Sequence, residues 1–137
     1  MTVILSAAAL VACADSGHEQ CRAVQRVLMH EQGPFVLPGT IAEEVDALLV
    51  RRVPGARRGF FEDLVKRRFH VERLVRGDAP ALERLEREYP ELEINEMAIV
   101  IVAARLRCTR IVTLDEQPFR AIRPLYGEAF TLLPADV

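Results

Sequence analysis

The hydrophobic and polar positions of this chain alternate between short apolar runs and longer segments with a helical period. Strands are expected at residues 2–5, 34–37 and 110–114, because these runs are short, apolar and rich in β-branched residues. A weaker strand is expected near residues 69–74, and a last one at residues 130–133. Strands that alternate with helices predict an α/β fold with a mainly parallel sheet and helices on both faces.

The helical segments are marked by start and stop signals. Capping-box patterns run from Ser16 to Glu19 and from Thr40 to Glu43, and Asp78 is expected to cap a later helix. The segment 94–106 is apolar almost all round, as is typical of a helix buried on several sides. Helices are therefore predicted over residues 16–31, 40–53, 56–68, 79–89 and 94–106, with a short helical piece before the last strand.

Length and composition favour one folded domain over residues 1–137, because half of the residues are hydrophobic. No apolar run reaches the roughly 18 to 20 residues that span a bilayer, so no membrane association is expected. The N-terminal segment is apolar but lacks a positively charged start, which favours a buried strand over an export signal and predicts a cytoplasmic protein. The three cysteines show no metal-type spacing and are expected to be buried thiols.

Charge is nearly balanced, at −2, so no global field attracts nucleic acid. The cations are distributed unevenly, however, and cluster at residues 51–58 and 66–68; all of them except Lys66 are arginine. Arginine suits phosphate recognition because of its bidentate fork. The cluster is equally explained by a solvated helical hairpin, so it is compatible with RNA without indicating it.

Four positions carry the candidate chemistry. Ser6 and Asp115 each follow a predicted strand, and the carboxyl ends of parallel strands share one edge of a sheet, where α/β proteins place their sites. Glu44 lies beside the apolar stripe of its helix, and Glu96 lies in the first turn of the most apolar helix. Taken singly, each glutamate is explained as an acid near a helix N-terminus. Together, three converging carboxylates repel one another and favour a hard divalent cation.

Two segments resemble the motifs of PIN-domain ribonucleases, best known as the toxins of VapBC-type toxin–antitoxin pairs. The family's second motif resembles IAEEVDALLVRR, which places its glutamate on Glu44. Its third and fourth motifs resemble NEMAIVIVAARLRCTRIVTLDEQPF, which places their acids on Glu96 and Asp115. The similarity extends over essentially the whole chain. It implies a PIN-like three-layer α/β/α fold with a central, mainly parallel sheet of about five strands.

The resemblance also implies an activity and partners. PIN nucleases hold Mg²⁺ or Mn²⁺ with three or four carboxylates and cleave RNA, so Glu44, Glu96 and Asp115 are expected as catalytic residues and metal ligands. An RNA substrate, an antitoxin protein and a homodimer are implied as well. The chain departs from the family at two positions, because Ser6 stands where the first aspartate is expected and Glu96 replaces another aspartate. Of the nearby acids only Asp15 is placed to compensate, and it fits a helix-capping loop better.

Two hypotheses follow from the degenerate position at Ser6. In the first, the chain is a Mg²⁺- or Mn²⁺-dependent endoribonuclease with reduced activity, because a neutral hydroxyl cannot replace a carboxylate ligand. In the second, it is a catalytically inactive PIN module that binds RNA or a protein partner, with weak or absent metal binding. Whether Ser6 arose naturally or by a deliberate change is open, although the accompanying Glu96 favours natural divergence.

Overall fold

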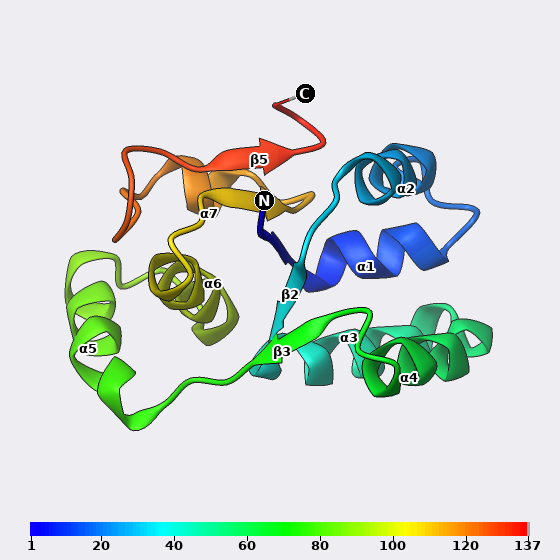
Figure 1. The fold of residues 1–137 in the computed structure, drawn as a ribbon, viewed down its shortest axis with the longest axis horizontal. Helices are drawn as coiled ribbons and strands as arrows, with labels where there is room; N and C mark the ends of the chain where they lie inside the picture. Colours follow the sequence, from blue (N-terminus) through cyan, green and yellow to red (C-terminus); the bar gives the residue numbers. More distant parts are fainter. Residues whose placement is uncertain (137) are drawn as a thin grey trace.

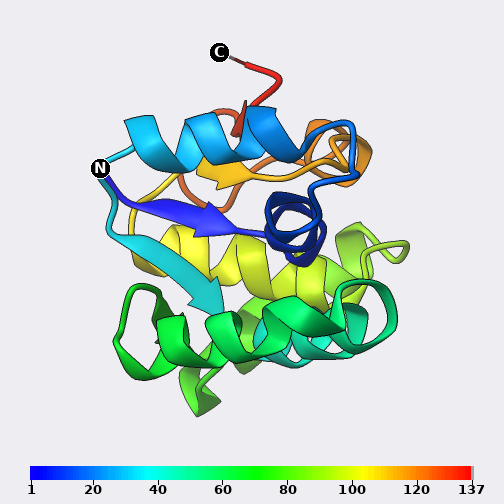
Figure 2. The same ribbon diagram turned by 90° about the vertical axis from the view of Figure 1, so that its right-hand side faces the viewer.

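The computed structural model describes residues 1–136 and contains a five-stranded sheet with the strand order β3-β2-β1-β4-β5. All neighbouring strands run parallel, as the arrows in Figure 2 show for the centre of the sheet. The predicted α/β class with about five strands is therefore confirmed. The strands are β1 (Val3–Leu5), β2 (Phe35–Pro38), β3 (His70–Glu72), β4 (Arg110–Val112) and β5 (Thr131–Leu133).

Helices cover both faces of this sheet and produce the three layers of an α/β/α fold. Figure 1 shows α1 and α2 on one side of the strands and α5 and α6 on the other. Two short 3₁₀ segments, Pro54–Ala56 and Arg76–Asp78, precede α4 and α5. The helices are α1 (Ala7–Ala14), α2 (Cys21–His30), α3 (Gly39–Arg52), α4 (Arg57–Val65), α5 (Ala79–Glu88), α6 (Ile94–Arg105) and α7 (Gln117–Arg120).

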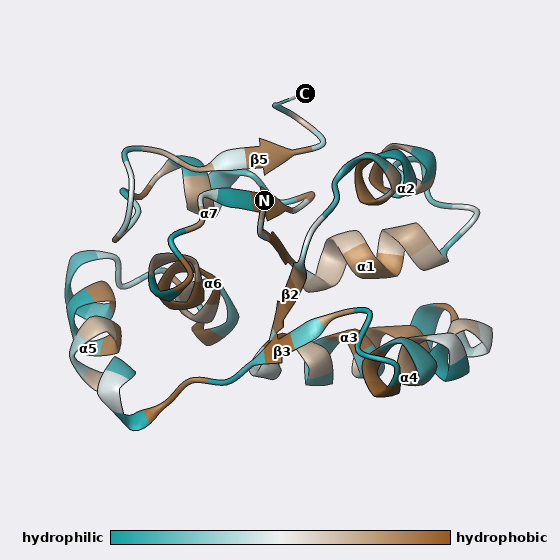
Figure 3. Cartoon of the chain, viewed as in Figure 1, coloured by the Kyte–Doolittle hydropathy of each residue, from teal (hydrophilic) through white to brown (hydrophobic). Residues whose placement is uncertain are grey.

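The core lies around β1, which is the central strand. Ile4 pairs in register with Val36 on one side and with Ile111 on the other, and Ile4 and Ile111 are fully buried. A strand buried on both faces needs apolar side chains at every position, which explains the continuous run Val3–Leu5. Helix α6 contributes a continuous buried run, Ala98–Ala103, and the dark brown of α6 and of the central strands in Figure 3 marks the same core.

Helix α1 is a correction to the sequence analysis, which predicted no helix there. Its sequence, AAALVACA, has no polar face, and only two of its residues are exposed, so no amphipathic period marks it. Alanine is the strongest helix former, which explains why eight residues suffice when they are packed between neighbours. Ser6 is the N-cap of this helix, with its hydroxyl oxygen accepting a hydrogen bond from the Ala9 N–H at 3.4 Å.

The two predicted capping boxes were wrong. Helix α2 begins only at Cys21, and α3 begins at Gly39 after Pro38; neither has a side-chain cap. The hydroxyl oxygen of Thr40 is buried without a hydrogen-bond partner. Because α3 starts earlier than expected, Glu44 lies in its second turn. Asp78 is the N-cap residue of α5, as predicted, but its side chain accepts a hydrogen bond from the Val75 N–H and none from α5.

The remaining expectations from composition concern cysteines and membranes. Cys21 and Cys108 are buried and Cys13 is half-buried, and all three thiols are free. Burial raises the pKa of the Cys13 and Cys108 thiols, which keeps them protonated and inert. Over residues 1–136, no helix combines the length and apolarity required to cross a bilayer.

Candidate functional site

The candidate site lies at the edge of the sheet where β1 and β4 end. The two strands are neighbours, and the Ser6 N–H donates to the Val112 carbonyl oxygen at 3.0 Å, so the residues that follow them emerge side by side. Ser6 comes directly after β1, and Asp115 lies three residues after the last residue of β4. The prediction that parallel strand ends would bring these positions to one edge is therefore correct.

Ser6 is only 8% exposed and has a structural task. Its backbone is extended, with φ −92° and ψ 161°, which is typical of a residue that turns a strand into a helix. Its hydroxyl oxygen already accepts one hydrogen bond from the first turn of α1. The hydroxyl thus serves the strand-to-helix junction, a role that an aspartate also fills well.

Asp115 is presented by a turn that Thr113 organises. The Thr113 side chain is buried, and its hydroxyl oxygen accepts a hydrogen bond from the Asp115 N–H at 3.1 Å. The Thr113 N–H donates to the Leu133 carbonyl at 2.9 Å and so extends the contact with β5. The backbone around Asp115 is therefore held from both sides, while the carboxylate itself is exposed.

Glu44 projects from α3 beside its buried stripe, as the helical wheel predicted. Ile41, Val45 and Leu49 are buried in the core, whereas Glu44 is exposed. The Asn95 side-chain nitrogen on α6 donates to Glu44 Oε2 at 2.5 Å. This hydrogen bond links two helices that are 51 residues apart in the sequence.

Glu96 is half-buried in the first turn of α6, where its Oε1 accepts a hydrogen bond from the Glu93 N–H at 2.9 Å. Burial raises the pKa of the Glu96 carboxyl, and the Glu93 N–H acts in the opposite direction. Nearby negative charges also raise this pKa, because the ionised form of Glu96 is repelled by the carboxylates around it. These charges are those of Glu93, Asp115 and Glu44.

These side chains line one cavity of about 170 Å³. It contains all four positions predicted from the sequence, namely Ser6, Glu44, Glu96 and Asp115. Within residues 1–136, no three His, Cys, Asp or Glu side chains lie close enough together to hold a metal ion as they stand. Two of the three predicted acids instead accept hydrogen bonds at the start of α6, Glu44 from Asn95 and Glu96 from its N-cap residue Glu93.

The cavity also contains polar residues that the sequence analysis missed, namely Asn95, Glu93 and Thr113. Asn95 and Glu93 flank Glu96 at the start of an otherwise apolar helix, and that contrast was a usable signal. Thr113 gave no signal, because threonine is common in strands. Asp15 does not line the cavity; it accepts a hydrogen bond from the Gly17 N–H at 3.0 Å in the loop after α1.

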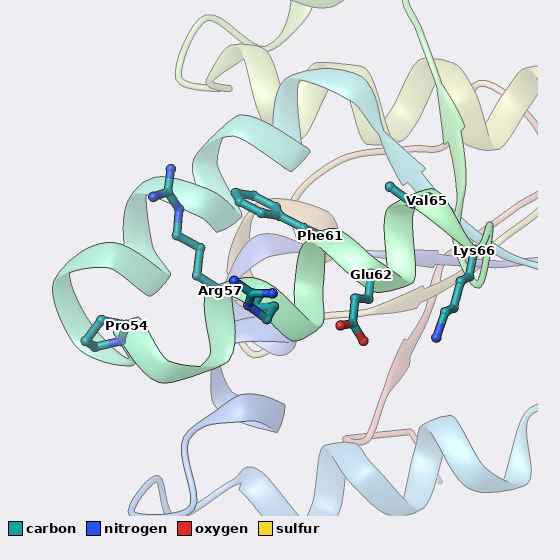
Figure 4. A pocket seen from close by; sticks show the side chains of 7 residues that line it. Pro54, Arg57, Phe61, Glu62, Val65 and Lys66 are labelled. Atoms are coloured by element: carbon teal, nitrogen blue, oxygen red, sulfur yellow. The ribbon is translucent and has the colours of Figure 1, made fainter.

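A second hollow, of about 590 Å³, runs along α4 and contains none of the predicted site residues. Figure 4 shows Arg57, Phe61, Glu62 and Lys66 projecting from this helix. The Arg57 guanidinium lies over the Phe61 ring at 5.0 Å from its centre. Apart from Glu62, the lining of this hollow is basic and apolar, so the hollow differs from the acidic cavity in both charge and location.

The chain was compared with known proteins. No family model matches it. A curated relative, ribonuclease VapC26 of Mycobacterium tuberculosis (strain ATCC 25618 / H37Rv), is 26% identical over 135 residues, which are 96% of this chain and 100% of the relative. The likeness thus spans nearly the full length of both chains.

Solved structures with the same fold include three toxin or toxin–antitoxin proteins. VapC20 of M. tuberculosis, a Sarcin-Ricin loop cleaving toxin, has a TM-score of 0.73 at 16% identity and covers 88% of this chain and 95% of its own. A toxin–antitoxin complex from Klebsiella pneumoniae has a TM-score of 0.70 at 15% identity, covering 92% and 100%. VapBC2 of Rickettsia felis, bound to a DNA fragment from their promoter, has a TM-score of 0.67 at 12% identity, covering 96% and 98%.

The fold and the position of the acidic cavity define the class, a PIN-like α/β/α domain with its polar residues at the carboxyl edge of a parallel sheet. Within this class, the sequence similarity to a VapC ribonuclease indicates a VapC-type PIN domain. The predicted resemblance to a VapC-type PIN domain is thereby confirmed.

Proposed function

We propose that residues 1–137 act as a single PIN-like domain with Mg²⁺- or Mn²⁺-dependent endoribonuclease activity of the VapC toxin type. The observation that supports this most directly is the convergence of Glu44, Glu96 and Asp115 on one cavity. The similarity to a protein named as a ribonuclease supports the choice of RNA as substrate.

The donor set of the cavity matches a hard divalent cation in kind. Its ionisable groups are carboxylates, and none of the ion pairs within residues 1–136 involves Glu44, Glu96 or Asp115. Carboxylates near one another without a cation repel, and the pKa of Glu96, raised first by burial, is raised further by the charges of Glu93, Asp115 and Glu44. Mg²⁺ and Mn²⁺ favour such oxygen ligands. Side-chain rotations are required, since the acids do not yet form a ligand group.

In the proposed site each residue has a distinct task. Glu44 and Asp115 are expected to hold the cation directly or through water. Glu96, with its raised pKa, is expected to act as a third ligand or to orient the attacking water. When bound, the cation would activate water and neutralise the charge that develops on the RNA phosphodiester.

Ser6 limits this activity. It supplies no negative charge, and its hydroxyl oxygen is already the cap of α1. Losing even a partner that only orients a ligand typically lowers metal affinity or activity about 10- to 100-fold, so replacing a ligand by serine is expected to cost at least that much. The proposed enzyme is therefore a slow one.

A second candidate is a catalytically inactive PIN module that binds RNA or a protein partner. The observation that favours it is that Glu44 and Glu96 form hydrogen bonds within the protein, with no three acids gathered in residues 1–136 for a metal. In either case an antitoxin partner remains part of the proposal, supported by neighbours that were solved as toxin–antitoxin complexes. A homodimer also remains part of the proposal, from the family resemblance alone.

Cleavage of a structured RNA with Mn²⁺ distinguishes the two candidates when the unmodified chain, Ser6→Asp and Asp115→Ala are measured side by side. The enzyme is expected to show weak cleavage that Ser6→Asp increases and Asp115→Ala abolishes. Cleavage that persists unchanged in Asp115→Ala would overturn the proposed site. Silence of the unmodified chain and of Ser6→Asp would reject the enzyme and favour the binding module.

A further inference from the structure

Asn95 is a residue of the acidic cavity to which neither the sequence motifs nor the proposed mechanism assigns a task. It is the second residue of α6, and it lies half-buried between the exposed Ile94 and Glu96. Its side-chain nitrogen donates to Glu44 Oε2 at 2.5 Å. Asn95 thus connects the helix that carries Glu96 to the helix that carries Glu44.

The other end of the Asn95 amide has no partner. Its Oδ1 is buried and no donor in residues 1–136 reaches it, and unpaired buried groups of this kind are rare in native proteins. Turning the amide over would place this oxygen against the Glu44 carboxylate, where two acceptors repel. The hydrogen bond to Glu44 therefore fixes the orientation of the amide and leaves its oxygen without a hydrogen-bond partner.

A neutral donor at this position has a different effect from a cationic one. Eight ion pairs within residues 1–136 join an arginine to a carboxylate, and none of them involves Glu44. An arginine would orient the carboxylate but also cancel its charge. Asn95 orients it and leaves its negative charge available. No side-chain hydrogen bond to Glu44 Oε1 is present in the described residues.

We infer that Asn95 is a positioning residue that holds Glu44 in the cavity through a neutral N–H donor, so that the carboxylate remains free to bind a cation. This inference rests on the proposed function, because it assigns a task within the same site. Asn95 is not a ligand here, since its only remaining acceptor is buried.

Binding of Mn²⁺ alone tests the inference, with the free ion followed by electron paramagnetic resonance in the full chain. Asn95→Ala and Asn95→Asp are both expected to weaken Mn²⁺ binding about 10- to 100-fold, the usual effect of removing a residue that orients a ligand. The aspartate variant has nearly the same shape but no N–H to donate. Gln25→Ala is the matched control, because Gln25 is also an amide that donates across helices, to the Cys13 carbonyl, outside the acidic cavity.

A double-mutant cycle separates positioning from a general structural role. Asn95→Ala is expected to lose its effect on Mn²⁺ binding in a Glu44→Gln background, because it acts through Glu44. Independent, additive losses would overturn the inference. Thermal unfolding in EDTA checks that each variant is folded. If Asn95→Ala does not fold, the test rests on Mn²⁺ binding by the isosteric Asn95→Asp.

The remaining outcomes are equally decisive. Tighter Mn²⁺ binding by Asn95→Asp would overturn the inference, because it would make an acceptor, and not the donor, the useful group. Unchanged binding by Asn95→Ala would overturn it while leaving the proposed metal site in place. Absence of Mn²⁺ binding by both the unmodified chain and Ser6→Asp would overturn the proposed function and this inference together.

Discussion

Glu44 and Asp46 lie two residues apart on helix α3 in opposite electrostatic surroundings. Asp46 receives hydrogen bonds from Arg57, from Nε at 2.6 Å and from Nη2 at 3.1 Å, and this guanidinium holds the pKa of the Asp46 carboxyl below its usual range. Glu44 receives one hydrogen bond from a neutral amide. The Arg57 guanidinium neutralises the charge of Asp46, whereas the neutral Asn95 amide leaves the charge of Glu44 unpaired.

The same contrast recurs between the cavity and the ion pairs found elsewhere in residues 1–136. In this arginine-rich chain eight carboxylates outside the cavity are paired with arginine, as Asp63 is with Arg68 and Asp136 with Arg120, whereas others on the surface, such as Glu43 and Glu62, are not. The carboxylates of the cavity at the ends of β1 and β4 are paired with none. The difference teaches that the candidate site is distinguished by several carboxylates that line one cavity without an arginine partner, and not by the number of acids alone.

The largest effect on RNA cleavage is expected when the two carboxylates of α3 are neutralised one at a time. Glu44→Gln should lower Mn²⁺-dependent RNA cleavage by at least about 10- to 100-fold, because a proposed ligand loses its charge. Asp46→Asn should leave cleavage unchanged, since Asp46 faces Arg57 and does not line the cavity. Initial rates of both variants at equal protein concentration check this. Equal losses would show that the comparison has no functional meaning.

A somewhat smaller effect is expected from the metal on stability. Mn²⁺ at about a hundredfold excess over its dissociation constant should stabilise the folded chain by about 2.7 kcal/mol, because it binds only the folded state. At the same Mn²⁺ concentration the shift should fall to about 0.4 to 1.4 kcal/mol or less in Glu44→Gln, for a 10- to 100-fold loss of affinity, and stay at full size in Asp46→Asn. Thermal unfolding with and without EDTA measures it. A shift of the same size in Glu44→Gln would place the metal elsewhere.

Ser6 offers a smaller, purely structural effect. Ser6→Ala should lower the free energy of unfolding by about 1 kcal/mol, because the first turn of α1 loses its capping oxygen. Mn²⁺ binding should not change, since the hydroxyl is proposed to be a cap and not a ligand. Urea unfolding and a Mn²⁺ titration of the same sample check both statements. Weakened Mn²⁺ binding in this variant would make the hydroxyl oxygen a ligand.

The smallest effect is expected on the paired surface. Hydrogen bonds from Arg120 and from the Leu132 N–H lower the pKa of Asp136 in the folded chain. A lowered folded pKa means that the stabilisation is present above the unfolded value of about 3.9 and is lost as pH falls through the folded value. Asp136→Asn should therefore lower the melting temperature slightly at neutral pH, and less at more acidic pH. A difference that grows on acidification would contradict the pairing.

The fold was largely predictable because its signals are local. The runs Val3–Leu5 and Arg110–Val112 are apolar and β-branched, and each is followed by a polar residue, which was enough to place Ser6 and Asp115 at one sheet edge. Helix α1 escaped prediction because a helix buried on several sides shows no period. The capping boxes failed because Ser16 and Thr40 have the right residue types, but α2 and α3 begin elsewhere.

By itself, the sequence determined the alternation of strands and helices, the parallel sheet and the three acids that meet at its edge, since periodicity and strand ends follow from neighbouring residues. Tertiary structure alone decided what each acid faces. Glu44 meets Asn95 across 51 residues and Asp46 meets Arg57 across 11, on elements whose relative placement depends on packing of the whole core. Electrostatic surroundings depend on distances in space, so no local sequence pattern distinguishes Glu44, which faces a neutral amide, from Asp46, which is paired with an arginine.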